Sequence, residues 1–151
     1  MLTLPQTAEY ALKAVAYIAA AEAEGRPARV PEIAEALDVP RNYLSKTLHQ
    51  LARAGVLLST RGPQGGFRLA HAPDRVHLNT IVAPFLPSGG PVCILGRTAC
   101  SDVRPCAAHH RWKPVRDQMN AFFAKTTVAD LLASPGGVGP RSPSATAAAL
   151  K

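Results

Sequence analysis

The chain has 151 residues, which is enough for one folded domain with a substantial core. Hydrophobic residues make up 47% of the sequence and aromatic residues only 5%, so the core must consist mainly of Leu, Val, Ile and Ala. The net charge is +7 and the pI is near 9.8, which favours a polyanionic partner such as nucleic acid or a membrane surface. The apolar run at residues 14–21 is too short to span a bilayer, and Glu9 and Lys13 argue against a signal peptide. We therefore expect a cytoplasmic protein whose thiols stay reduced.

The first predicted helix covers residues 7–24. Apolar residues recur along one side of it at helical spacing, at Ala11, Ala14, Val15 and Ile18. Thr7 can act as the N-cap of this helix, because its hydroxyl can accept from a free backbone amide. Gly25 and Pro27 are typical of a helix end. We expect the apolar stripe to be buried.

Two shorter helices are predicted next, over residues 31–37 and 41–54. Pro31 suits the first turn of a helix, and residues 38–40 (Asp-Val-Pro) form a tight turn between the two. The side chains expected to face inward are Ile33, Ala34, Leu37, Leu44, Leu48 and Leu51. Two short helices joined by three residues, the second polar on its outer face, predict a helix-turn-helix.

A hairpin is predicted directly behind the second of these helices. Residues 56–61 and 67–69 indicate two strands, and residues 62–66 (GPQGG) indicate a turn that needs positive φ angles. A hairpin at this place is the wing of a winged helix.

Charge favours the same interpretation. No acidic residue lies between Asp38 and Asp74, whereas six of the ten acidic residues lie within the first 38 positions. An ordinary solvated basic face is the alternative, but the basic stretch coincides with the helix-turn-helix and the wing, and together they predict DNA binding. The residues expected to contact DNA are Arg41, Asn42, Ser45 and Lys46 on the recognition helix and Arg61, Gln64 and Arg68 on the wing, with Arg61 placed to enter a minor groove.

The second half begins with a short helix or strand-to-helix passage at residues 76–86 and a Gly/Pro hinge at residues 87–91. After Cys106, apolar residues recur in the 4-3-4-3 steps of a heptad seam, at Ala108, Trp112, Val115, Met119 and Phe122. This seam predicts a long helix that pairs two subunits, and the alternative is an amphipathic helix packed on its own domain. Pro114 either kinks the helix or marks its first turn.

All three cysteines of the chain lie close together, at Cys93, Cys100 and Cys106. Small and turn-forming residues separate them, so we expect a loop that can fold its sulfurs around one centre. Thiolates are soft ligands that select zinc, copper(I) or iron–sulfur clusters. The odd count argues against a disulfide framework, and the C-x6-C-x5-C spacing lacks the C-x2-C pairs of a zinc finger. Three unrelated buried thiols are the alternative, but a metal or cluster site is favoured.

Three features together carry a family resemblance. The wing, RGPQGGFRL at residues 61–69, resembles RGPxGGYxL, and TVADL at residues 127–131 resembles a C-terminal T-L-x-x-L ending. With the cysteine positions, these make residues 1–132 similar to the cluster-binding winged-helix repressors that include the iron–sulfur assembly regulator IscR and the nitric-oxide sensor NsrR. The resemblance implies a homodimer, an iron–sulfur cluster ([2Fe-2S] or [4Fe-4S]) in each subunit, and repression through a palindromic operator.

The resemblance leaves the fourth ligand open. Cys106-Ala-Ala-His109 matches the C-x2-H of the assembly regulators, in which the histidine is a ligand, and a histidine one turn after Cys106 on a helix would share its face. In the nitric-oxide branch the fourth ligand is an acid near the N-terminus of the partner subunit, where Glu9 stands here. Ser45 replaces a glutamate of the assembly regulators, so the recognition helix is nearer to the nitric-oxide branch. The first cysteine interval is also one residue longer than the usual five.

We thus predict a mainly α protein with a small β wing: a winged helix-turn-helix at residues 1–75, a cluster-binding loop and dimerisation helix at residues 76–133, and a disordered tail at residues 134–151. Its function would be cluster-controlled transcription regulation, sensing nitric oxide, redox or iron–sulfur status. Rival interpretations are a winged-helix regulator with a structural Cys/His zinc site or without a cluster, and an enzyme that uses Cys106 with His109. The enzyme is disfavoured because two other cysteines would have no role.

Overall fold

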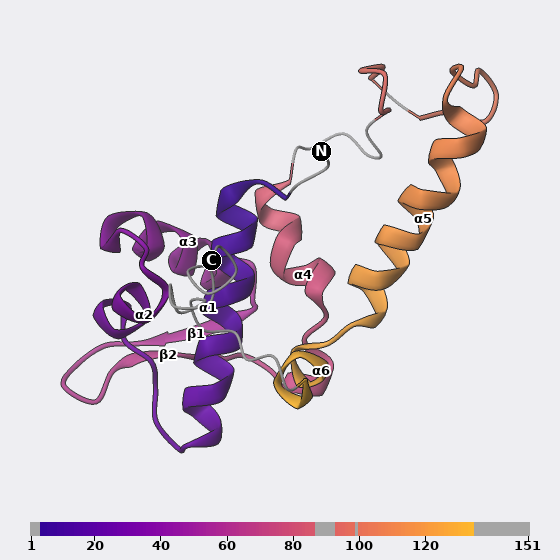
Figure 1. Ribbon diagram of the computed structural model, residues 1–151. Coiled ribbons are helices and arrows are strands. Elements are labelled where there is room, and N and C mark those ends of the chain that lie inside the picture. Colours follow the sequence, from indigo (N-terminus) through magenta and orange to yellow (C-terminus); the bar gives the residue numbers. More distant parts are fainter. Residues whose placement is uncertain (1–3, 87–92, 99, 135–151) are drawn as a thin grey trace, which may run out of the picture.

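The computed structural model describes residues 4–86, 93–98 and 100–134. In these ranges the chain is mainly helical with one two-stranded antiparallel sheet, which confirms the predicted fold class (Figure 1). None of the helices described is long and apolar enough to cross a membrane. The predicted hinge at residues 87–91 and the predicted tail from residue 135 onward lie outside the described residues.

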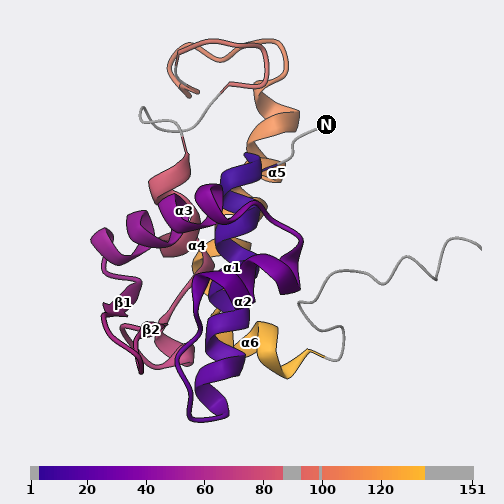
Figure 2. The ribbon, with the colours of Figure 1, turned by 90° about the vertical axis from the view of Figure 1, so that its left-hand side faces the viewer.

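The elements follow one another in this order: α1 (Gln6–Ala23), α2 (Val30–Leu37), α3 (Arg41–Arg53), β1 (Leu57–Thr60), β2 (Gly66–Leu69), η1 (Pro73–Arg75), α4 (Leu78–Val82), η2 (Ala83–Phe85), α5 (His109–Lys125) and α6 (Val128–Ala133). Helix α1 lies at the centre and contacts α2, α3, α4, α6 and β2. Helix α5 extends to one side of this body and packs on α4 (Figures 1 and 2).

Helix α1 begins one residue earlier than predicted and is capped differently. Its N-cap residue is Pro5, and no side chain caps the helix, so the prediction for Thr7 is wrong. Thr7 lies inside the first turn, where its hydroxyl is 3.5 Å from the hydroxyl of Tyr43. Gly25 follows the helix with φ +80°, a left-handed conformation that favours glycine, so the predicted end is confirmed.

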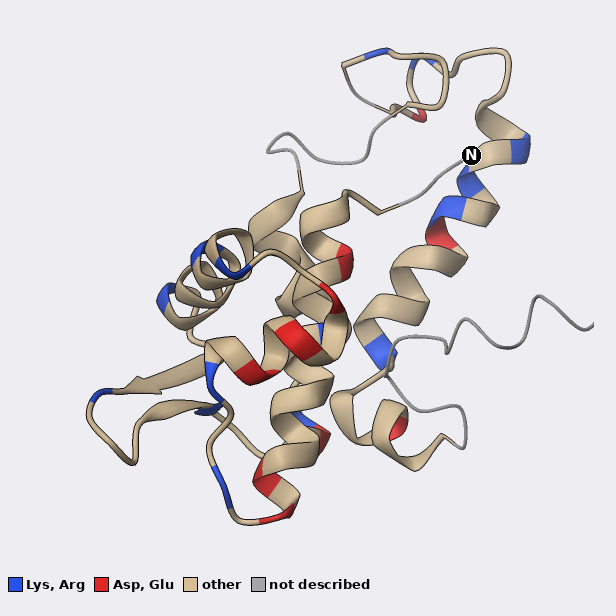
Figure 3. Cartoon of the chain, turned by 60° about the vertical axis from the view of Figure 1, so that its left-hand side comes forward, with Lys and Arg blue, Asp and Glu red and all other residues tan. Residues whose placement is uncertain are grey.

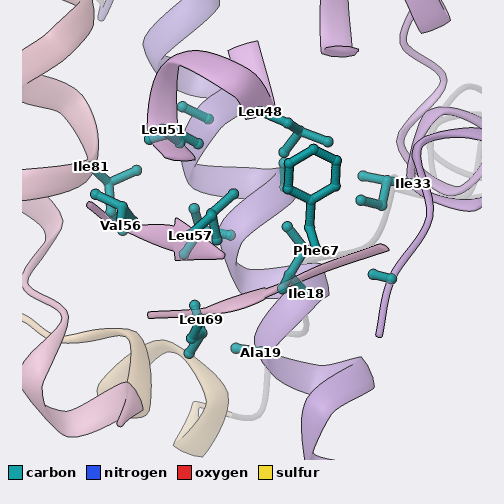
Figure 4. Packing of buried hydrophobic residues seen from close by; sticks show 14 of the residues in the cluster. Ile18, Ala19, Ile33, Leu48, Leu51, Val56, Leu57, Phe67, Leu69 and Ile81 are labelled. Carbon is teal, nitrogen blue, oxygen red and sulfur yellow. The ribbon is translucent and has the colours of Figure 1, made fainter. Parts of the chain in front are cut away.

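The helix-turn-helix forms as the sequence predicted. The turn depends on Asp38, which adopts the left-handed conformation with φ 53° and ends α2 sharply. The inward-facing residues of α2 and α3 are all buried, namely Ile33, Ala34, Leu37, Leu44, Leu48 and Leu51. Figure 4 shows Leu48 and Ile33 around the ring of Phe67, which comes from the wing. The core thus joins the recognition helix α3 to the base of the hairpin.

The wing is held from both sides. Strand β1 pairs with β2 over its whole length, from Leu57 with Leu69 to Thr60 with Gly66. On the other edge of β2, Phe67 exchanges two backbone hydrogen bonds with Ala28, of 2.8 and 3.1 Å. Position 65 of the adjoining turn cannot accept a side chain, since a Cβ on Gly65 would lie 2.4 Å from the Thr60 carbonyl oxygen.

The segment after α5 returns to the body of the protein. The Leu78 amide donates to the Thr126 carbonyl (3.0 Å) and the Val128 amide to the Val76 carbonyl (2.9 Å), so the chain after α5 pairs with the segment before α4. Val128 is fully buried there and belongs to the main core. Pro114 lies in the interior of α5, since the helix starts at His109, and it therefore does not mark the first turn.

We predict that Gly65→Ala destabilises the protein by roughly 2 kcal/mol, because the new Cβ would collide with backbone atoms of the hairpin. Chemical denaturation would measure the free energy of unfolding. Gln64→Ala is the matched control, since Gln64 is exposed in the same turn. Equal stability of the two variants would contradict this account of the wing.

Candidate functional site

The first turns of α3 present polar side chains to solvent. Arg41, Asn42 and Lys46 are exposed and Ser45 is half-buried, as expected for a helix that enters a DNA groove. Tyr43, between them, is turned toward α1. Its ring meets that of Tyr10 edge-on, with centroids 6.1 Å apart.

The three predicted wing residues lie in different places. Arg61 and Gln64 are exposed in the turn of the hairpin, where a groove of DNA can be reached. Arg68 lies on β2 opposite Leu58 and is half-buried. Its guanidinium lies 3.4 Å from the Gly25 carbonyl oxygen, so it is directed toward the end of α1 rather than toward the tip of the wing.

Basic and acidic residues are separated over this domain. Figure 3 shows the basic positions along α3 and at the hairpin on one side, while the acidic positions cluster on α1 and α2. The acids on that side pair locally: Glu32 with Arg26 (2.9 Å) and Glu9 with Lys13 (2.6 Å). The uneven distribution of charge along the sequence is therefore also an uneven distribution over the surface, which favours the approach of a polyanion.

The sequence interpretation missed part of this face. An open hollow of about 750 Å³ runs beside α3, and we name it the His49 hollow; its lining residues are Ser45, Lys46, His49, Gln50, Ala52 and Arg53. Helical spacing from Lys46 would have identified His49 and Arg53, which follow it by three and seven positions.

The cysteine loop (residues 93–98 and 100–108) brings Cys93 and Cys106 together, with their sulfurs 3.5 Å apart and both side chains buried. Cys93 opens a tight turn in which the Gly96 amide donates to the Cys93 carbonyl (2.9 Å) and Gly96 has φ +76°. The backbone amides of Leu95 and then Arg97 point at the Cys93 sulfur and lower its pKa. Amides arranged in this way stabilise a thiolate.

The third cysteine pairs with a histidine. The Cys100 sulfur is 3.4 Å from Nδ1 of His109, a residue only 3% exposed. The other ring nitrogen, Nε2, is 2.8 Å from the Asp102 carboxylate, which also accepts from Lys113 at 2.8 and 2.9 Å. Lys113 and, second, His109 lower the pKa of Asp102 to about 2.

Two expectations for this loop are wrong. Helix α5 begins at His109, so Cys106 precedes the helix instead of lying in its first turn, and its carbonyl accepts from the His109 amide (3.0 Å). His109 also faces Cys100 rather than Cys106. The expectation that Cys106 and His109 share one face of a helix fails because α5 starts only at His109.

The described side chains do not converge on one point. In the ranges that the structure describes, no group of three or more His, Cys, Asp or Glu side chains is arranged to hold a single metal ion. The cysteine loop instead contains two pairs, Cys93 with Cys106 and Cys100 with His109. Glu9, the other predicted ligand, is exposed on the first turn of α1 and bonded to Lys13.

The predicted seam on α5 is covered only at its start. Trp112 is buried, whereas Val115, Met119 and Phe122 are 48%, 38% and 55% exposed. These three side chains follow one another at heptad spacing and form an apolar stripe along the outer part of the helix.

A helix-turn-helix with a hairpin wing and a basic outer face defines the class of winged-helix transcription regulators. Over residues 4–134 the chain matches the Rrf2 family, described as an iron-dependent transcriptional regulator, and it belongs to that family. A relative from Aquifex aeolicus (strain VF5), provisionally named an HTH-type transcriptional regulator, is 38% identical over 129 residues, which cover 83% of this chain and 88% of the relative. The regulator IscR of Aliivibrio salmonicida (strain LFI1238) is 25% identical over 131 residues, or 87% of this chain and 77% of that protein.

Solved structures agree with this assignment. CymR (YrzC), the global cysteine regulator of B. subtilis, is similar to this chain with a TM-score of 0.74 and 25% identity, covering 87% of this chain and 96% of that one. IscR of T. potens has the same fold, with a TM-score of 0.70 and 24% identity over 87% of this chain and 86% of that chain. The relatives are transcription regulators and not enzymes, which confirms that the chain is a regulator and not an enzyme.

Proposed function

We propose that the protein is a homodimeric repressor that binds a palindromic operator under the control of an iron–sulfur cluster held by the cysteine loop. Membership of the Rrf2 family, whose description is iron-dependent, supports control by iron chemistry. The observation that carries the proposal is the pairing of Cys93 with Cys106 and of Cys100 with His109.

The first step is DNA binding by α3 and the wing. Arg41, Asn42 and Lys46 are exposed on the recognition helix and Arg61 at the wing, so a helix in the major groove would place the hairpin beside the neighbouring minor groove. Arg68 contributes less directly, because its guanidinium faces the Gly25 carbonyl.

The second step is pairing of two subunits along α5. Half-sites of a palindrome lie about one helical turn of DNA apart, so two recognition helices must be held at a fixed spacing. The stripe of Val115, Met119 and Phe122 is exposed in the single chain, and a second copy of α5 would cover it.

The third step is the fit of the cysteine loop to a cluster. Two thiolates on one tetrahedral ion with bonds of about 2.3 Å lie roughly 3.8 Å apart, close to the 3.5 Å between the sulfurs of Cys93 and Cys106. The 3.4 Å contact of Cys100 with His109 supports a second such pair. Two pairs, each suited to one iron, favour a [2Fe-2S] cluster over a [4Fe-4S] cluster, in which each iron takes a single protein ligand.

For the fourth ligand the contacts favour His109 over Glu9. A ligating histidine usually donates its other ring N–H to a carboxylate, which fixes the tautomer and the ring orientation. Asp102 accepts from Nε2 in this way and is held in turn by Lys113, so Nδ1 of His109 would be left with a lone pair directed at Cys100.

The cluster would supply a centre that nitric oxide, a change of redox state or loss of iron can destroy. Within the chain, Cys106 is joined to the first turn of α5 through its carbonyl, which accepts from the His109 amide. Separation of the cysteine side chains would therefore act directly on α5, and with it on the spacing of the two recognition helices.

We expect Arg61→Ala to weaken operator binding about tenfold without changing the metal content, because one wing contact is lost. Gel shifts at fixed salt would measure the affinity. Arg75→Ala is the matched control, since Arg75 is also exposed but lies in η1, outside the wing. Equal affinity of wild type and Arg61→Ala would show that the wing does not contact DNA.

Met119→Glu should give monomers that no longer bind the operator, since a carboxylate would be buried between two copies of α5. Sedimentation velocity would report the mass. Asn120→Glu introduces the same charge about 100° around α5 from Met119, at an exposed position outside the apolar stripe, and should leave the dimer intact. A monomeric wild-type protein would rule out the dimer.

Each of Cys93→Ala, Cys100→Ala and Cys106→Ala should abolish iron and sulfide binding after anaerobic reconstitution. His109→Ala should alter the visible absorption spectrum, whereas Glu9→Ala and the neighbouring His110→Ala should not. The reverse result for Glu9 and His109 would assign the fourth ligand to the partner subunit. Zinc without sulfide in the wild-type protein would favour the structural zinc site instead.

A further inference from the structure

The His49 hollow gathers positive charge beyond the first turns of the recognition helix. Lys46, His49 and Arg53 are exposed on one side of α3, three and four positions apart. All three line the hollow, which is open to solvent and has a volume of about 750 Å³. The imidazole of His49, which lies between the two cations along α3, is therefore accessible to a ligand that approaches this helix.

The position of one hydrogen on His49 follows from its contacts. Its Nδ1 lies 2.7 Å from the backbone carbonyl oxygen of Ser45. A carbonyl oxygen can only accept, so Nδ1 must carry the hydrogen and donate it. In the neutral ring Nε2 is then a bare lone pair, and it becomes a donor only when the ring is an imidazolium. The ring is kept in place by an edge-on contact with Phe67 of β2, at 5.6 Å between centroids.

We propose that the His49 hollow binds a phosphate of the DNA backbone and that His49 takes part only in its protonated form. The inference rests on the DNA binding proposed above. Phosphate oxygens accept hydrogen bonds, so the lone pair on Nε2 of neutral His49 would oppose them, while the imidazolium donates.

The proposal links phosphate binding to proton uptake by His49. Lys46 and Arg53 of α3 line the same hollow as His49, and the ring of Phe67, which meets His49 edge-on from β2, is uncharged. A phosphate bound beside His49 would attract the imidazolium form of the ring and not the neutral form. DNA binding is therefore coupled to protonation of His49, and affinity rises as the pH falls.

A contact to a base would have the opposite pH dependence. The bare Nε2 of the neutral ring can accept from the amino group of adenine or cytosine, the donors that the major groove presents. That contact is lost on protonation and is specific to sequence. The sign of the pH dependence therefore separates a phosphate contact from a base contact.

The test compares wild type with His49→Phe, which retains a ring against Phe67 but removes both nitrogens. Two duplexes of equal length are used, one enriched by the wild-type protein from a random library and one unrelated in sequence. At about pH 6 we expect the variant to bind both roughly tenfold more weakly, with a slope of log K against log salt smaller by about 0.9. At about pH 8 the two proteins should bind nearly alike.

His71→Phe is the matched control, because His71 is exposed and follows β2 at the end of the hairpin away from its turn. Lys46→Ala and Arg53→Ala should weaken binding to both duplexes equally at the two pH values, because each removes a contact to phosphate and leaves His49 in place.

The other outcomes overturn the inference. A loss confined to the enriched duplex and larger at about pH 8 would assign His49 to a base. If the variant loses affinity to the same extent at every pH and salt concentration, or loses none, His49 does not bind phosphate and only packs against Phe67. A wild type that enriches and binds no duplex would refute the proposed DNA binding, and this inference with it.

Discussion

The alanine-rich surface of α1 is the feature on which the rest of the structure depends. The residues involved are almost fully buried: Ala8, Ala11, Ala14, Ala16, Ala19 and Ala21. Because alanine carries nothing beyond Cβ, the elements around α1 can approach its backbone closely. Helices α2, α3, α4 and α6 and strand β2 all contact it. A larger side chain at these positions would push α3 and β2 away from α1, so the placement of the recognition helix and the wing depends on residues buried in the core.

The parts of the fold that depend on local sequence could be predicted, and those that depend on contacts through space could not. Helical periodicity identified the buried leucines of α3, and the glycines identified the hairpin. The pairing of Ala28 with Phe67, which holds the outer edge of the wing, leaves no pattern in the sequence. Threonine is a common N-cap residue, yet Pro5 occupies the N-cap position of α1 and the Thr7 hydroxyl lies near that of Tyr43.

The candidate metal site shows the same division. Its residue set was predicted, because three cysteines and a histidine close in sequence can meet in one loop. Which residues pair was not, since the assumed helix from Cys106 starts only at His109. The tight turn at Gly96 returns the chain beyond Cys93, so Cys93 meets Cys106 while Cys100 is left to His109. Asp102, whose carboxylate accepts from Nε2 of His109, reaches the ring from the loop before α5, and no spacing pattern in the sequence indicates this contact.

Under the proposed function, a signal at the cysteine loop would have to travel far within one chain, because the loop lies at the end of α5 opposite the wing (Figures 1 and 2). The recognition helix is tied at both ends to segments that lead to the candidate ligands. At its start, Tyr43 contacts Tyr10, the residue after Glu9. In its last turns, Gln50 donates to the Pro84 carbonyl (2.8 Å) in η2, close before the chain leaves for the cysteine loop. Whether Glu9 or His109 is the fourth ligand, a displacement of the chain segment next to it would therefore be transmitted to α3 through one of these two contacts. Since α3 is packed on the core along its buried face, such a displacement would move the helix as a rigid unit rather than bend it.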